Sequence, residues 1–302
     1  MNISVGIVGL PNAGKSTLFN ALAQRRLSPT ASHPFTTIEP HEAVVAVPDK
    51  NLEKLADIVQ QTNPQTQVIP ATVTFIDIAG LVKGAAEGEG LGNQFLAKIR
   101  EVDAIVHVVR NFEDENVPHV GYPSGNEGPK KNIEIVQEEL QKAGIEKPTL
   151  YVLNVSEKDL PNELKIDIKP LIKICAKLEE DLSDLSSEER QEYLKQSGIE
   201  QSALDILIRE SYKLLNLITF YTIKGGKEVH AWTLREGENV IRAAEKVHTD
   251  FAKKFIKAEV IPVQALIEIG SWKKAHELGK IALSGRDYIV KDGGVIEFKV
   301  NA

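Results

Sequence analysis

A glycine-rich motif near the start of the chain limits the possible folds most strongly. Residues 9–16 read GLPNAGKS, which fits the pattern G-x-x-x-x-G-K-S/T. The apolar segment 3–8 before the motif predicts a strand, and residues 15–24 after it predict a helix. In such a strand–loop–helix unit, backbone N–H groups of the glycine-rich turn and of the first helical turn face the phosphates of a nucleotide. The motif therefore predicts a P-loop nucleotide-binding domain.

The order of apolar segments predicts the fold around this motif. Short apolar runs alternate with helical patterns, at 3–8, 43–47, 72–76, 104–109, 149–153 and 171–175. This alternation is typical of an α/β fold with a mostly parallel sheet and helices on both faces. The pattern over 186–216 predicts a helix with Ser187 as its N-cap.

The pattern changes near residue 217. Segments 219–223, 229–234, 288–291 and 295–300 predict short strands around one helix over about 240–258. We therefore expect two domains. They are a nucleotide-binding domain over 1–216 and a small α+β domain over 217–302.

Composition excludes several classes of protein. The 302 residues are 42% hydrophobic and 26% charged, which excludes a disordered or collagen-like chain. A net charge of −7 argues against extensive nucleic-acid coating but leaves room for a local basic face. The single cysteine cannot form an internal disulfide and suits a reducing compartment. Because no apolar stretch reaches the roughly 18 residues of a membrane span, we expect a soluble cytoplasmic protein without a membrane partner.

The P-loop residues have distinct roles in the expected site. The ammonium group of Lys15 would place a positive charge beside the phosphates, where it would act in catalysis. The hydroxyl of Ser16 would bind Mg²⁺. The residues expected to contact the nucleotide here are Pro11, Asn12, Ala13, Gly14, Lys15, Ser16 and Thr17.

Two further segments supply the remaining expected ligands of Mg²⁺ and of the γ-phosphate. The sequence DIAG at 77–80 closes a buried strand, so that Asp77 can hold Mg²⁺ through water and the Gly80 N–H can contact a γ-phosphate. The polar loop 33–37 reads HPFTT, and we prefer Thr37 to Thr36 as the ligand that reaches Mg²⁺ from the other side. Ordinary turn residues are the alternative interpretation of both segments.

Four motifs in a fixed order resemble one family. The segments GLPNAGKST, HPFTTIEP, DIAGLVKGAAEGEGLGNQFL and NVSE closely resemble the Obg-like ATPase family, called YchF in bacteria. The C-terminal segments HAWTLREG, AAEKVHTDFAKKFIKAEV and GRDYIVKDGGVIEF resemble the TGS domain of that family, a small β-grasp module. The resemblance covers nearly the whole chain. It implies a P-loop NTPase of the TRAFAC GTPase-like type, followed by a TGS domain.

The expected base-reading segment departs from that of ordinary GTPases. A GTPase would carry Asn-Lys-x-Asp after strand 149–153, whereas residues 154–157 here read Asn-Val-Ser-Glu. The lysine that packs on the base is replaced by Val155, and the longer Glu157 carboxylate does not build the guanine-binding fork. We expect Asn154 to keep its purine contact. The resemblance implies ATP preference, or relaxed selectivity between ATP and GTP.

The resemblance also implies a last nucleotide loop and a source of catalysis. The loop begins at Cys175 and Ala176, although a buried strand end is an equally good interpretation of Cys175. The position that carries glutamine in many GTPases is Leu81, which cannot orient water by a hydrogen bond. The resemblance therefore assigns this role to His119 on a loop, and it implies a K⁺ ion held by Asn12.

One part of the family pattern is missing. The family carries a substantial helical insertion between the strand near residue 109 and the strand at 149, whereas only the short segment 121–148 fills that place here. The roles of that insertion, including a nucleic-acid groove beside the TGS domain, do not transfer to this chain without it.

Together these features predict a Mg²⁺-dependent ATPase, with GTP bound more weakly, that acts as a nucleotide-controlled switch associated with ribosomes. RNA contact is expected through a basic cluster. This cluster comprises four lysines in the segment 246–257 together with Lys273, Lys274 and Arg286. Two alternatives remain open, a GTPase switch in ribosome assembly and a nucleotide-sensing protein with negligible turnover.

Overall fold

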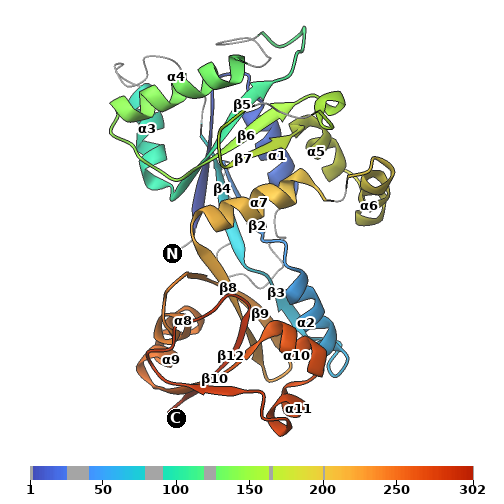
Figure 1. The fold of residues 1–302 in the computed structure, drawn as a ribbon, viewed down its shortest axis with the longest axis vertical. Coiled ribbons are helices and arrows are strands. Elements are labelled where there is room, and N and C mark those ends of the chain that lie inside the picture. Colours follow the sequence, from blue (N-terminus) through green and yellow to red (C-terminus); the bar gives the residue numbers. More distant parts are fainter. Residues whose placement is uncertain are drawn as a thin grey trace. The chain divides into compact units, whose positions relative to one another are not determined.

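The computed structural model of the chain describes residues 3–25, 41–78, 91–118, 127–162, 166–199 and 201–301. These residues fall into two units (Figure 1). Unit 1 comprises residues 1–28, 37–46 and 73–215. Unit 2 comprises residues 29–36, 47–72 and 216–302.

Unit 1 is built on a six-stranded sheet in the order β2-β4-β1-β5-β6-β7. The strands are β1 (Ser4–Val8), β2 (Glu42–Ala46), β4 (Thr72–Asp77), β5 (Ala104–Asn111), β6 (Thr149–Val155) and β7 (Leu171–Ile174). Strand β1 pairs in parallel with β4 and β5, and the pairs β5–β6 and β6–β7 are also parallel. The predicted parallel sheet is confirmed. Its strands are mostly apolar because both faces of such a sheet are covered.

Helices cover this sheet on both faces. The helices of unit 1 are α1 (Lys15–Gln24), α3 (Leu91–Glu101), α4 (Gly128–Lys142), α5 (Ala176–Ser183), α6 (Ser187–Gln196) and α7 (Ala203–Leu214), with a short 3₁₀ helix η1 (Glu157–Asp159). Figure 1 shows α3 and α4 on one side of the sheet and α1 and α7 on the other. On the first side, Phe95 and Ile99 of α3 and Val136 of α4 pack into one core with Val8 of the central strand.

The helical pattern over 186–216 forms two helices rather than one. The N-cap of α6 is Ser186 and not Ser187, so that prediction is wrong. The Ser186 hydroxyl accepts a hydrogen bond from the Glu189 N–H at 3.3 Å, and the Glu189 carboxylate accepts one from the Ser186 N–H at 2.9 Å. This reciprocal capping box satisfies two of the free N–H groups at the helix start.

Unit 2 contains a second six-stranded sheet in the order β11-β10-β12-β8-β9-β3. The strands are β3 (Gln67–Ile69), β8 (Leu217–Lys224), β9 (Glu228–Arg235), β10 (Phe255–Pro262), β11 (Ala282–Ser284) and β12 (Gly294–Val300). The sheet is mixed, since β12–β8 and β3–β9 are parallel whereas β8–β9 and β10–β12 are antiparallel. Its helices are α2 (Lys50–Gln60), α8 (Val240–Val247), α9 (Thr249–Lys253), α10 (Val263–Ile269) and α11 (Trp272–Glu277).

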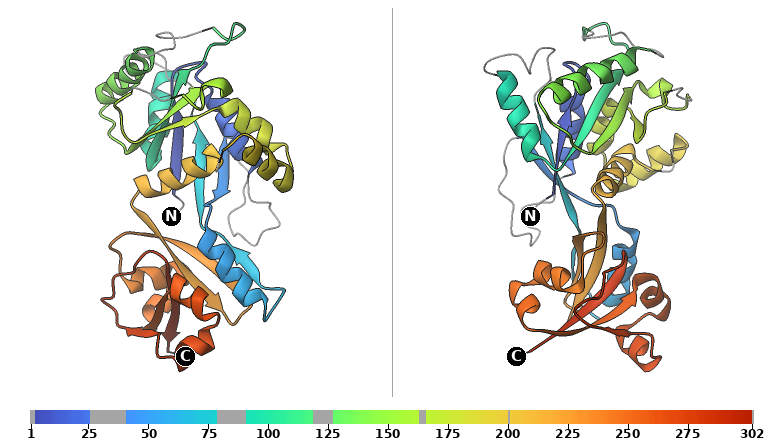
Figure 2. Two further views of the ribbon diagram at one scale, coloured as in Figure 1. Left: turned by 45° about the vertical axis from the view of Figure 1, so that its right-hand side comes forward. Right: turned by 60° about the vertical axis from the view of Figure 1, so that its left-hand side comes forward.

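Unit 2 therefore takes a segment from the first half of the chain. Residues 47–72 group with it, in contrast to the continuous domain expected over 1–216. Strand β3 pairs with the start of β9, and Thr66 donates a hydrogen bond to the Gly226 carbonyl at 2.7 Å. Helix α2 lies beside the strands of this unit (Figure 2). Its N-cap, Asp49, accepts a hydrogen bond from the buried Tyr221 hydroxyl at 2.8 Å.

The expected helix over 240–258 is wrong. Helix α8 ends at Val247, and His248 is extended with φ of −164°. The His248 ring then caps the separate helix α9 by accepting a hydrogen bond from the Asp250 N–H at 3.1 Å. Phe255 has helical spacing in the sequence but begins β10, where it pairs with Val300. Residues 288–291, expected as a strand, form only one isolated bridge, between Asn239 and Ile289.

Candidate functional site

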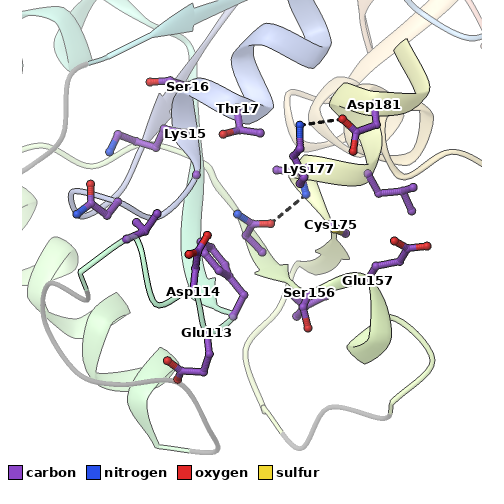
Figure 3. Close-up of a pocket in the computed structure, with 18 residues that line it drawn as sticks. Lys15, Ser16, Thr17, Glu113, Asp114, Ser156, Glu157, Cys175, Lys177 and Asp181 are labelled. Atoms are coloured by element: carbon purple, nitrogen blue, oxygen red, sulfur yellow. Dashed lines mark hydrogen bonds and ion pairs between the residues drawn. The ribbon is translucent and has the colours of Figure 1, made fainter. Parts of the chain in front are cut away.

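A cavity of about 550 Å³ opens at the carboxyl ends of β5, β6 and β7 in unit 1 (Figure 3). Its size suits a ligand such as a nucleotide. Crevices at this edge of a parallel sheet are the usual place for ligands in α/β folds. The lining residues are Asn12, Gly14, Lys15, Ser16, Thr17, Phe112, Glu113, Asp114, Val117, Asn154, Val155, Ser156, Glu157, Cys175, Ala176, Lys177, Leu178 and Asp181.

The turn between β1 and α1 requires glycine at two positions. Gly14, the N-cap of α1, has φ of +93°, and a Cβ there would lie 2.2 Å from Nδ2 of Asn154. A Cβ at Gly9 would lie 2.3 Å from the carbonyl oxygen of Val108. Both glycines allow the turn to approach the neighbouring backbone or side chain closely.

Lys15 lies inside this turn and is only 7% exposed. Its ammonium group donates a hydrogen bond to the Leu10 carbonyl at 2.9 Å. Burial lowers the pKa of Lys15, and the nearby Asp77 carboxylate opposes that shift. Phosphate oxygens would supply the negative charge that a buried ammonium group requires.

Asn154 joins two walls of the cavity and is 4% exposed. Its Nδ2 donates a hydrogen bond to the Ala13 carbonyl at 3.0 Å. Its Oδ1 accepts one from the Ala176 N–H, also at 3.0 Å. Both hydrogen bonds are buried, so Asn154 fixes the P-loop relative to the turn between β7 and α5.

At the far end of the cavity, Glu157 is tied to helix α6. Its Oε1 accepts a hydrogen bond from the Tyr193 hydroxyl at 2.7 Å, and this bond raises the pKa of Tyr193. The Tyr193 ring also packs against the cluster around Cys175 and Leu182. Cys175 is both a buried strand end and a lining residue, and burial raises the pKa of its thiol.

The structure brings ten of the predicted site residues to one cavity. They are Asn12, Gly14, Lys15, Ser16, Thr17, Asn154, Val155, Glu157, Cys175 and Ala176. Pro11 and Ala13 instead line a small cavity beneath the P-loop, together with His107 and Arg110. Thr37, Gly80 and His119 lie outside the described residues, and so does Leu81.

The two described candidates for Mg²⁺ binding carry suitable donors. Ser16 presents an exposed hydroxyl at the start of α1, and Asp77 is half-buried at the end of β4. Oxygen donors of this kind suit Mg²⁺, which keeps several water and phosphate ligands in P-loop sites. In the part of the chain that the structure describes, no group of three or more His, Cys, Asp or Glu side chains could hold a metal by itself. This arrangement fits a Mg²⁺ site in which the nucleotide phosphates supply some of the ligands.

Several residues near the cavity were not predicted from the sequence. Figure 3 shows Glu113 and Asp114 on a wall across from the P-loop, and Lys177 paired with Asp181 at 2.8 Å. His107 lies beneath the P-loop, where burial and the charge of Lys15 lower its pKa to about 3, so its ring is neutral. A polar residue within an apolar strand is the signal that could have identified it.

Two family models match the chain. Residues 4–155 match the model MMR_HSR1, described as "50S ribosome-binding GTPase". Residues 217–301 match YchF-GTPase_C, described as "Protein of unknown function (DUF933)". In the described residues, no helix has the length and apolar character needed to cross a membrane.

Full-length relatives are similar to the whole chain. The "Ribosome-binding ATPase YchF" of Escherichia coli O157:H7 is 40% identical over 371 aligned positions, which cover 100% of both chains. The Bacillus subtilis protein of the same name is 38% identical over 374 positions, again with full coverage. The solved structure of the Schizosaccharomyces pombe YchF GTPase has a TM-score of 0.82 at 30% identity and covers 99% of this chain and 98% of its own.

The alignment length shows that the bacterial relatives contain residues that this chain lacks. The alignment with the Escherichia coli protein spans 371 positions, whereas this chain has 302 residues. Between β5 and β6 the structure describes a loop up to residue 118 and then the single helix α4.

Proposed function

The chain belongs to the YchF family of P-loop nucleoside triphosphatases, and we propose that it is a ribosome-associated ATPase that binds ATP in preference to GTP. The observation that carries this proposal is the pair of residues at the end of the cavity where the base would bind. Val155 stands where a GTPase has lysine, and the Glu157 carboxylate accepts a hydrogen bond from Tyr193. This hydrogen bond directs the carboxylate toward α6, so we infer that it is not aligned with the paired N–H donors of a guanine base. Relatives named ribosome-binding ATPases support ribosome association and ATP hydrolysis.

The described residues can bind and polarise a triphosphate. The P-loop amides and Lys15 would contact its β- and γ-phosphates. In hydrolysis, water forms a bond to the γ-phosphorus while the bond to the β–γ bridging oxygen breaks, which yields ADP and phosphate. Ser16 and Asp77 would hold Mg²⁺, with Thr37 as a further ligand, and this ion supplies positive charge beside the phosphates.

We also propose which side chain orients the attacking water. We assign this role to His119, since the position of Leu81 offers no hydrogen bond. Gly80 would contact the γ-phosphate through its N–H. Binding of K⁺ at Asn12 stays a prediction. In the structure the Asn12 Nδ2 donates a hydrogen bond to the Pro118 carbonyl.

ATP preference is tested by titration calorimetry with Mg²⁺ and non-hydrolysable ATP and GTP analogues on one preparation. We expect tighter binding of the ATP analogue. Tyr193→Phe removes only the hydroxyl that holds Glu157, so this variant should gain affinity for the GTP analogue by about 3- to 10-fold, the effect of one exposed hydrogen bond worth about 1 kcal/mol.

A matched control for this variant is Tyr151→Phe. Tyr151 also uses its hydroxyl, as acceptor of a hydrogen bond from Gln137 Nε2 at 2.6 Å, but it does not line the cavity. Its ATP and GTP affinities should equal those of the unaltered chain. Tighter binding of the GTP analogue by the unaltered chain would show that ATP preference is wrong and would favour the GTPase switch.

Ribosome contact is proposed for unit 2, which we interpret as a TGS domain. Lys253, Lys254 and Lys257 are exposed at the junction of α9 and β10. Arg286, in the same predicted cluster, donates a hydrogen bond to the Phe255 carbonyl at 3.2 Å. These side chains can bind RNA phosphates.

We expect the double variant Lys253→Glu/Lys254→Glu to co-sediment with ribosomes several-fold less than the unaltered chain, with a weaker salt dependence. Lys280→Glu, an exposed charge reversal in the same unit but outside the cluster, should co-sediment normally. Equal loss in both variants would mean that the cluster makes no specific contact with RNA.

A further inference from the structure

A buried arginine organises one wall of the nucleotide cavity. Arg110 lies at the end of β5 and is 4% exposed. Its Nε donates a hydrogen bond to the Phe112 carbonyl at 3.1 Å, and its Nη2 donates one to the Val117 carbonyl at 3.0 Å. Its Nη1 donates to the Pro118 carbonyl at 3.2 Å. The guanidinium carbon also lies 4.4 Å from the centre of the Phe112 ring.

These contacts use the geometry of the guanidinium group. In the described residues, no carboxylate forms an ion pair with Arg110, so three backbone carbonyls of the segment 112–118 stabilise its charge. A planar group with five N–H donors can bind several separated acceptors at once, whereas an ammonium group on a flexible stem cannot hold them in one plane. Arg110 therefore holds the segment 112–118 by binding the backbone carbonyls of Phe112, Val117 and Pro118.

The loop that Arg110 holds is part of the cavity. Phe112, Glu113, Asp114 and Val117 all line it, across from the P-loop. Within the loop, the Asp114 carboxylate accepts a hydrogen bond from the Asn116 N–H at 2.9 Å. This internal bond does not attach the loop to the sheet. Arg110 provides that attachment.

One acceptor links this loop to the P-loop directly. The Pro118 carbonyl receives hydrogen bonds from Arg110 and also from Nδ2 of Asn12, the latter at 3.0 Å. Asn12 has φ of +62°, a left-handed backbone conformation, and its side chain extends from the P-loop to the segment 112–118. A shift of the P-loop therefore acts on the same oxygen that Arg110 holds.

We propose that Arg110 is a positioning residue for nucleotide binding. It holds the loop 112–118 as a wall of the site, and through the shared Pro118 carbonyl it couples this wall to Asn12 of the P-loop. This inference rests on the proposed function, because the ligand it concerns is the nucleoside triphosphate.

The test compares Arg110→Lys and Asn12→Ala, singly and together, with the unaltered chain. We expect Arg110→Lys to weaken binding of the non-hydrolysable ATP analogue by about 10-fold in calorimetry and to speed amide hydrogen exchange over 112–118. The analogue should slow exchange there in the unaltered chain and have little effect in Arg110→Lys. Because both side chains act on one oxygen, the double variant should lose less affinity than the product of the two single losses.

Arg100→Lys is the matched control. Arg100 is exposed in the same unit and donates one hydrogen bond to the Ala143 carbonyl at 3.0 Å, so its replacement should leave ATP affinity and exchange over 112–118 unchanged. If Arg110→Lys does not fold, Asn12→Ala alone still tests the junction through exchange over 112–118. Unchanged affinity in a folded Arg110→Lys, or strictly multiplicative losses in the double variant, would overturn the inference. Failure of the unaltered chain to bind any nucleotide would instead overturn the proposed function.

Discussion

Gly14→Ala should weaken ATP binding by about 100-fold or more, which corresponds to about 2.8 kcal/mol. The new Cβ would lie 2.2 Å from Nδ2 of Asn154, a distance that no real contact reaches. To relieve this clash, Asn154 must move and give up its hydrogen bonds to Ala13 and Ala176. Each such buried bond contributes about 1 kcal/mol. Calorimetry with a non-hydrolysable ATP analogue measures the loss.

Gly144→Ala separates this steric effect from backbone strain. Gly144 also has positive φ, at +64°, but nothing lies within 4 Å of its would-be Cβ. This variant should lose about 1 kcal/mol of unfolding free energy and keep its ATP affinity. If Gly14→Ala bound ATP as tightly as Gly144→Ala does, the close contact between the P-loop and Asn154 would not matter for the ligand.

Asn154→Ala should weaken ATP binding by about 10- to 100-fold and lower the unfolding temperature by several degrees. The substitution leaves the Ala13 carbonyl and the Ala176 N–H without their buried partner. It thereby separates the P-loop from the turn that follows β7. Calorimetry and thermal unfolding monitored by circular dichroism measure the two effects.

Two further variants sharpen the interpretation of Asn154. Asn154→Asp keeps an acceptor for the Ala176 N–H but loses the donor to Ala13, so its ATP affinity should also fall. Asn162→Ala removes an exposed asparagine that donates to Asp159 at 3.1 Å, and should change neither affinity nor stability. An Asn154→Ala variant with normal affinity would contradict the bridging role.

The sequence predicted the parts of the site that depend on local signals. The strands of the first sheet are apolar runs, and the P-loop is a contiguous motif, so both are visible in short windows. Arg110 was not predicted because its partners are backbone carbonyls, which any residue supplies. The bond between Tyr193 and Glu157 spans 36 positions and depends on how α6 packs.

The same reasoning explains the errors in unit 2. Strand β3 has only three residues, two of them exposed, and its pairing partner lies far along the chain at β9. No local pattern marks such a strand. Phe255 shares helical spacing with Phe251, yet pairing with β12 decides its conformation, because tertiary contacts override local periodicity.

The assignment of residues 47–72 to unit 2 also has a consequence for synthesis. Helix α2 and strand β3 leave the ribosome long before β9 and Tyr221, on which they depend. They must wait unpaired while most of unit 1 is made, and residues 47–72 can complete their unit only when the last third of the chain emerges. A fragment that starts at residue 217 would leave the edge of β9 open to pairing with another molecule. The two units are therefore interleaved along the chain, and unit 2 begins to be synthesised before unit 1 is complete.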